Sequence, residues 1–205
     1  MKKLFVVIVL LLGFGISNVF SSTKNDTVPQ QHNSNGGINV YVGYGVGTIY
    51  TFTNKVGHDY TVSGKDFTNV GSYGAFLIGF DGNVSKVVSI GFDFSYVPLN
   101  YTGIKEDTTT TLYYKDNVLS GAVKLQFNYI NKPIVRAYSG ISLGISYIFS
   151  SVTDKGDINE SVKTIRPAGQ LTLMGIRVGK QLCGFGEFGF GTNGIIVVGL
   201  NYRFK

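Results

Sequence analysis

The residues with the clearest potential for catalysis are His58 and Asp59, with Ser63 a few positions further along the chain. A histidine oriented by a neighbouring carboxylate can act as the base that activates a serine hydroxyl. His58 lies in a polar stretch, however, and no second motif accompanies it, so we interpret it as a hydrated loop residue. Glu106 and Asp107 have the character of a solvated loop as well. The sequence therefore predicts no enzyme, no cofactor and no metal site.

Two other features have a structural interpretation. Gly43, Gly45 and Gly47 alternate at period two, so they occupy one face of a strand. A phosphate-binding loop would instead need a turn from a strand into a helix. Cys183 is the only cysteine, which excludes an intramolecular disulfide.

The composition favours a β protein with little exposed polar surface. Charged residues make up 15% of the 205 residues, against about 25% in an average soluble domain. The chain has 28 Gly, 13 Tyr and 15 Phe but only 4 Pro, and this glycine content argues against a helical bundle. The net charge is +6, with Lys and Arg scattered along the chain. Nucleic-acid binders concentrate such charges on one face, so we expect no nucleic-acid partner.

The N-terminus has the organisation of a secretory signal peptide. Lys2 and Lys3 precede an apolar run from Leu4 to Ile16, and Val19 and Ser21 suit a cleavage site. The run is shorter than the roughly 20 residues of a spanning helix, which disfavours an uncleaved anchor. We expect a signal peptide at 1–21, a flexible polar segment at 22–37 and one domain at 38–205.

From Ile38 onward, apolar residues alternate with small or polar ones. Between Val135 and Phe149, for example, one face is almost entirely apolar and the other carries mainly Gly and Ser. Side chains of a strand point alternately to opposite faces, so this period predicts strands. We expect eight, at 38–53, 70–81, 87–98, 117–130, 134–149, 167–180, 184–190 and 195–204. In the sixth, the alternation changes parity, and a bulge near Met174 and Gly175 would restore it.

The connections between these strands alternate in length. Long polar loops are expected at 54–69, 99–116 and 150–166, and short turns at 82–86, 131–133 and 181–183. Such alternation is typical of an up-and-down barrel in a bacterial outer membrane. An even number of strands leaves both termini at the rim with the short turns.

Aromatic residues indicate which face is outside. They occur on the apolar face near both ends of the strands, as expected for two membrane interfaces. The predicted interface aromatics are Tyr50, Phe52, Phe94, Tyr96, Tyr147 and Phe149 near the long loops, and Phe80, Phe127, Tyr129, Tyr202 and Phe204 near the short turns. The other face has too few charges to form the exterior of a soluble barrel of the lipocalin kind.

The pattern from Ile38 to Lys205 resembles the small eight-stranded outer-membrane β-barrel proteins of Gram-negative bacteria, such as the OmpA transmembrane domain, OmpX and OmpW. The resemblance implies an all-β, antiparallel, up-and-down transmembrane barrel located in the outer membrane, among its lipids and lipopolysaccharide. The strand 195–204 resembles the C-terminal signal that the barrel-insertion machinery reads. Many members end on the aromatic residue, whereas here Phe204 is followed by Lys205.

Five charged residues fall on the predicted inner face: Asp93, Lys124, Arg136, Glu187 and Arg203. An eight-stranded barrel is only wide enough for its own side chains. Isolated charges there would be costly, so we expect them to pair, Glu187 with Arg136 among them, and to close the lumen.

The function that follows is a non-enzymatic surface protein, structural or binding an extracellular partner through its long loops. One alternative is an enzyme that modifies lipids at the outer rim, or a conduit for a small ligand. A soluble secreted β-barrel binding protein is a third interpretation.

Overall fold

The computed structural model describes part of the chain. Its backbone is described at residues 37–52, 67–104, 111–154 and 157–204, and its side chains at 37–51, 71–100, 115–151 and 161–204. The predicted signal peptide and residues 22–36 lie outside these ranges and stay predictions. No helix within the described residues is long and apolar enough to cross a membrane.

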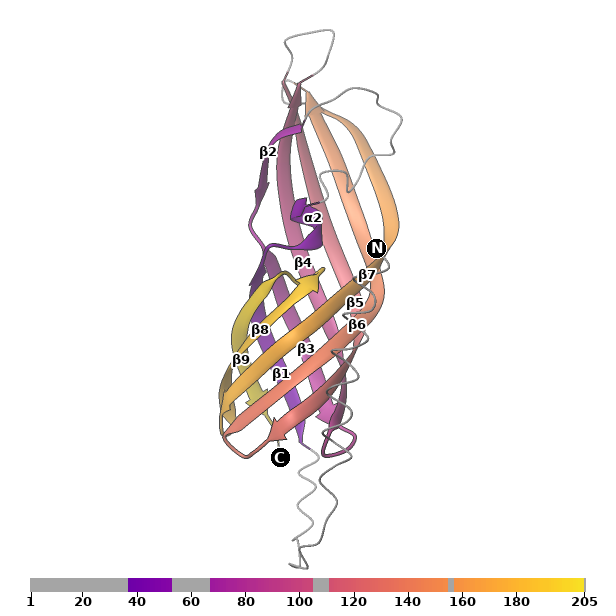
Figure 1. The fold of residues 1–205 in the computed structure, drawn as a ribbon. Coiled ribbons are helices and arrows are strands. Elements are labelled where there is room, and N and C mark those ends of the chain that lie inside the picture. Colours follow the sequence, from indigo (N-terminus) through magenta and orange to yellow (C-terminus); the bar gives the residue numbers. More distant parts are fainter. Residues whose placement is uncertain (1–36, 53–66, 105–110, 155–156, 205) are drawn as a thin grey trace, which may run out of the picture. The chain divides into compact units, whose positions relative to one another are not determined.

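The described residues form an antiparallel barrel (Figure 1). The elements are β1 (Ile38–Val46), α2 (Ile49–Phe52), β2 (Phe67–Ser72), β3 (Ala75–Asn83), β4 (Val88–Ile104), β5 (Thr111–Asn131), β6 (Val135–Asp154), β7 (Asp157–Gly179), β8 (Leu182–Gly191) and β9 (Ile196–Arg203). Eight strands, β1 and β3 to β9, form a ring in which each pairs with two others, and β1 closes the ring by pairing with β9. The predicted all-β, eight-stranded antiparallel barrel is therefore confirmed, with β2 as an additional strand outside the ring.

Closure satisfies the backbone hydrogen bonds of the barrel within the sheet itself. A closed ring has no exposed edge, which is the condition for β-structure in hydrocarbon. The two ends of the barrel domain meet at one rim, where the Phe204 amide donates to the Ile38 carbonyl at 2.8 Å. We call this end, with its short turns 84–87, 132–134 and 180–181, the terminal rim. The opposite end is the hairpin rim.

The first strand is shorter than predicted. The expected strand 38–53 ends at Val46, because Gly47 has a φ of 69°, which does not continue an extended strand. The chain then forms the helical turn α2, with Thr51 N donating to Thr48 O at 2.9 Å.

The predicted strand 70–81 is two strands that follow the same side of β4. Ser72 of β2 pairs with Leu99, and Phe76 of β3 pairs with Tyr96, further along β4. The break between them contains Gly74, whose φ of 82° interrupts the extended conformation.

Two of the three predicted long loops are wrong in their extent. Most of 99–116 and 150–166 continues the flanking strands as hairpins, so that β5, β6 and β7 have 21, 20 and 23 residues. A strand needs about 9–11 residues to cross a bilayer. These strands therefore extend beyond one crossing at the hairpin rim, and β7 pairs with β8 only from Gln170 onward. The first predicted loop lies mostly outside the described residues.

The sixth predicted strand, now β7, contains the expected bulge one residue earlier than predicted. Its register against β8 shifts between Thr172 and Met174. Leu173 and Met174 are both exposed, at 49% and 65%. The side chains beyond the bulge therefore change parity, and Arg177 points into the barrel.

The break at Gly74 provides a test of this description. A Cβ at Gly74 would lie 2.4 Å from the Gly45 carbonyl oxygen, on a backbone that L residues rarely adopt. We expect Gly74→Ala to lower the free energy of unfolding by about 1–3 kcal/mol. Gly82→Ala is the matched control, because no atom lies within 4 Å of its Cβ position. Urea unfolding in detergent micelles measures both, and equal midpoints would contradict the expectation.

Candidate functional site

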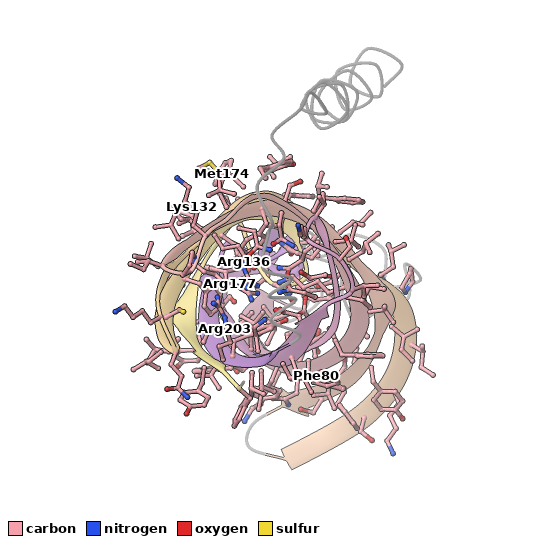
Figure 2. The ribbon with its side chains drawn as sticks, turned by 90° about the horizontal axis from the view of Figure 1, so that it is seen from below. Phe80, Lys132, Arg136, Met174, Arg177 and Arg203 are labelled. Atoms are coloured by element: carbon pink, nitrogen blue, oxygen red, sulfur yellow. The ribbon has the colours of Figure 1, made fainter. Side chains whose placement is uncertain are left out.

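The faces of the barrel are inverted relative to a soluble protein. Large apolar side chains cover the outside: Ile145 is 64% exposed, Leu200 56% and Val42 52%. The buried side chains that the structure describes are more often polar or charged than hydrophobic. Figure 2, which looks along the barrel, shows side chains both filling the ring and projecting from it.

Lysines bracket the apolar exterior. The exposed charged side chains among the described residues are Lys86, Lys132 and Lys180 in the short turns, and Lys115 and Lys163 on the extended hairpins. No other described charged side chain is exposed, so an uninterrupted apolar band separates the two groups. Such a band, bounded by charge, matches the cross-section of a lipid bilayer.

Nine of the predicted interface aromatics lie on the outside of the barrel. Toward the hairpin rim these are Phe94, Tyr96, Tyr147 and Phe149, and toward the terminal rim Phe80, Phe127, Tyr129, Tyr202 and Phe204. The side chain of Phe52 lies outside the described residues. Tyr147 is half-buried, because its ring packs against Phe149 with the centroids 4.6 Å apart.

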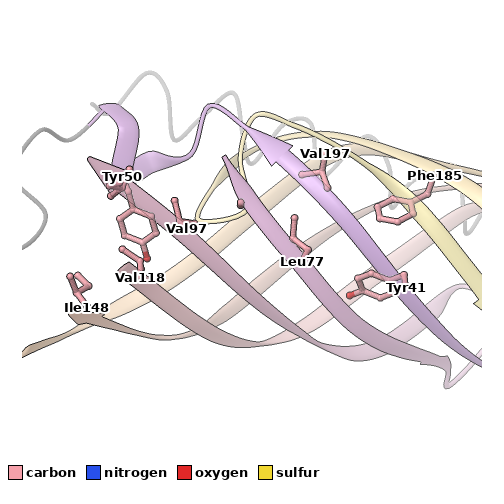
Figure 3. Packing of buried hydrophobic residues seen from close by; sticks show 10 residues of the cluster. Tyr41, Tyr50, Leu77, Val97, Val118, Ile148, Phe185 and Val197 are labelled. Carbon is pink, nitrogen blue, oxygen red and sulfur yellow. The ribbon is translucent and has the colours of Figure 1, made fainter. Parts of the chain in front are cut away.

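Tyr50 was assigned to the wrong face. The helical turn α2 directs it into the barrel, where it is 6% exposed and its hydroxyl bonds to the Ser146 hydroxyl. It joins Val97, Val118 and Ile148 in an apolar group near the hairpin rim (Figure 3). A strand through residue 50 would have put the ring outside, so the error follows from missing the turn after Gly47.

The middle of the interior holds a buried ion cluster. Lys124 Nζ lies 2.9 Å from Glu187 Oε1 and 3.9 Å from Asp93 Oδ2. Tyr138 donates its hydroxyl to Glu187 Oε1 at 2.7 Å, and the Tyr41 hydroxyl donates to Asp93. We call these five residues, each at most 6% exposed, the central cluster.

Each charge of the central cluster comes from an inward position between outward apolar residues. Asp93 stands between Phe92 and Phe94, and Lys124 between Val123 and Leu125. The alternation that coats the outside therefore also delivers these charges to the inside. Glu187 pairs with Lys124, so the predicted pairing of Glu187 with Arg136 is wrong.

A second cluster lies toward the terminal rim. Arg177 and Asp81 form a bidentate pair, with Nη1–Oδ1 at 3.1 Å and Nη2–Oδ2 at 2.6 Å. Asn39 donates to Asp81 Oδ1 at 2.7 Å and accepts from Arg203 Nε at 3.3 Å. With Arg136, these residues form what we call the terminal cluster.

Arg136 and Arg203 make no ion pair with any described residue. Arg136 is 3% exposed, and its Nη1 reaches Asn83 Oδ1 at 3.5 Å. Arg203 is half-buried. The sequence prediction therefore includes these two arginines but misses Asp81 and Arg177, the pair beside them. The parity change at the bulge was the available signal for Arg177.

Small and large inward residues complement one another. A Cβ at Gly199 would lie 2.5 Å from Phe185 Cε1, and one at Gly43 would lie 3.0 Å from its Cζ. The Phe185 ring thus occupies the space beside these glycines and meets Tyr41 edge-on at 5.7 Å. The inward glycines Gly43 and Gly199 therefore accommodate this ring.

The residues with catalytic potential are not part of this arrangement. His58, Asp59, Ser63, Glu106 and Asp107 all lie outside the described residues. Within the described part of the chain, no group of His, Cys, Asp and Glu is arranged to hold a metal ion.

A closed eight-stranded antiparallel barrel, apolar outside and polar inside, defines this fold as that of a small transmembrane β-barrel.

Solved structures with a similar fold include Ail, the attachment invasion locus protein of Yersinia pestis. Its complex with the heparin analogue sucrose octasulfate matches at 11% identity and a TM-score of 0.45, covering 82% of this chain and 97% of Ail. A second Ail structure matches at 10% identity and a TM-score of 0.44, with the same coverage. No family model matches the sequence. No curated protein matches it either.

The central cluster predicts a specific coupling. Glu187→Gln leaves Lys124 without its nearest carboxylate and should lower the free energy of unfolding by up to about 3–5 kcal/mol. Glu187→Gln combined with Lys124→Met should cost less than the sum of the two single changes. Urea unfolding in micelles measures the free energy of unfolding of the two single variants and the double variant. Lys132→Met, in an exposed turn, is the near-neutral control. Additive effects would show that the pair is not coupled.

Proposed function

We propose that this chain is a non-enzymatic surface protein of the bacterial outer membrane, with a lumen closed by its own side chains. The observation that carries the membrane location is the apolar band bounded by lysines at both rims. A soluble binding protein would expose this band to water. In the same proposal the predicted signal peptide directs export, and β9 carries the signal for the insertion machinery.

The hairpin rim is the proposed contact surface. The hairpins of β4 with β5 and of β6 with β7 extend beyond a bilayer crossing and carry exposed Lys115 and Lys163. Their length supports a role in binding a partner outside the cell, including lipopolysaccharide. With the termini in the periplasm, these hairpins face outward.

The closed lumen is proposed from its contents. Tyr41, Phe185 and the central cluster occupy the middle of a barrel that is just wide enough for side chains. This filling disfavours a small-ligand conduit. A lipid-modifying enzyme would need convergent polar groups at the outer rim, and the sequence motif for it, His58 with Asp59, is isolated.

Labelling of intact cells tests the location and the orientation together. We expect an epitope inserted at Thr109 to be labelled, and one inserted between Ser85 and Lys86 to be labelled only after the outer membrane is opened. Both tagged proteins should fractionate with outer membranes and migrate differently on gels when heated. Labelling of the second epitope alone in intact cells would reverse the orientation, and recovery from the soluble fraction would refute the membrane location.

Planar-bilayer recordings test the closed lumen. The purified protein should show at most rare, small openings. Removing two inward rings in Tyr41→Ala with Phe185→Ala should raise the conductance several-fold. Phe188→Ala, on the outside of the same strand as Phe185 and 48% exposed, is the control and should not change it. Steady large-conductance channels in the unchanged protein would favour the conduit instead.

A further inference from the structure

The terminal cluster carries more positive charge than its own carboxylate balances. It contains three guanidinium groups, of Arg136, Arg177 and Arg203, and one carboxylate, of Asp81. The Asp81 carboxylate is engaged by Arg177 in a bidentate pair. Two positive charges therefore remain without a carboxylate among the described residues.

The three arginines converge on one place. They come from β6, β7 and β9 and lie inside the ring of strands, whereas Lys132 of the same rim lies outside it (Figure 2). Arg136 lies directly opposite Arg177 in the pairing of β6 with β7, so their like charges repel. Like charges do not gather in a buried space unless something of opposite charge joins them.

The central cluster does not supply this opposite charge. Its carboxylates, Asp93 and Glu187, are already bonded to Lys124 and to the two tyrosines. Lys124 is positive as well, so the central cluster retains only one negative charge for the three arginines below it.

Unpaired hydrogen-bonding atoms lie in the same region. Arg136 Nε, Arg177 Nε and both side-chain polar atoms of Asn201 are buried without a partner in the described structure. Asn201 is fully buried, pairs in the sheet with Tyr41 and Cys183, and lies two residues before Arg203 on β9. Buried polar groups are almost always bonded, so the three nitrogen donors among these atoms indicate a missing acceptor.

We propose that the terminal cluster is a binding site for a single oxyanion of the phosphate class, held by Arg136 and Arg203. Guanidinium groups donate in a planar fork that fits phosphate oxygens, and Asn201 adds a neutral donor. A phosphate of charge −1 to −2 would balance the two unmatched guanidinium groups. The source is either a free phosphate or the phosphate of an anionic lipid headgroup at the rim.

This site goes beyond the proposed surface role, and it does not depend on which rim faces the cell exterior. The weak 3.5 Å contact of Arg136 with Asn83 leaves its guanidinium free to turn toward a ligand. Arg177, fixed by Asp81, would provide long-range attraction.

Phosphate binding by the folded chain in detergent is the direct test. The probe is inorganic phosphate, with sodium chloride at equal ionic strength as reference, followed by calorimetry and by the unfolding midpoint. Phosphate should raise the midpoint more than chloride does. Arg136→Gln should weaken phosphate binding by about tenfold or more, because one charge-assisted contact is lost. Lys132→Gln removes an exposed positive charge at the same rim and should leave binding within about twofold of the unchanged protein.

Nanodiscs distinguish the two sources. The unfolding midpoint is compared between phosphatidylglycerol and phosphatidylcholine nanodiscs. A higher midpoint in phosphatidylglycerol would assign the site to a lipid headgroup, provided that Arg136→Gln removes the difference and Lys132→Gln keeps it. Arg203→Gln serves as the second variant should Arg136→Gln not fold. The proposal is overturned if neither phosphate nor the anionic lipid stabilises the unchanged protein. It is also overturned if Lys132→Gln reduces phosphate binding, or the stabilisation by anionic lipid, as much as the arginine variants do.

Discussion

The narrow interior of an eight-stranded barrel governs the rest of this structure. Strand alternation sends every second side chain inward, and the inner space accepts little more than those side chains. In this chain the inward residues include the buried charges of Asp93, Lys124 and Glu187. They come from β4, β5 and β8, which are not all neighbours in the sheet. The ion cluster therefore ties opposite walls of the barrel together, in addition to the backbone pairing around the ring.

The same constraint explains the distribution of glycine. An inward ring such as Phe185 needs neighbours without side chains, and Gly43 and Gly199 provide them from β1 and β9. Glycine weakens a strand by its backbone entropy, but in a closed sheet each residue is held by neighbours on both sides. The high glycine content thus reflects the volume of the lumen and the few turns of positive φ.

Periodicity predicted the barrel because burial and exposure alternate strictly along most strands, as in β3 and β8. It failed where that signal ends. At 99–104 and 111–116 the sequence flanks a run of polar residues, so composition alone suggested loops. Tyr50 was misplaced because an aromatic residue suits both a membrane interface and a helical turn that directs it into the barrel. Arg177 lies after the bulge that the sequence predicted, where every position changes face, and it was missed because that change was not applied to the charged residues.

The interior changes character along the barrel in a way that follows from distance to water. Near the hairpin rim it holds the apolar group of Val97, Val118 and Ile148, with buried polar side chains such as Asp116 and Ser150 beside it. In the centre, where the desolvation of a charge costs most, Lys124 sits between two carboxylates. The unmatched positive charge lies toward the terminal rim, with half-buried Arg203 at its edge. There the effective dielectric is highest and an ion can enter from the solvent, so the charge imbalance occupies the end of the lumen where it is least costly.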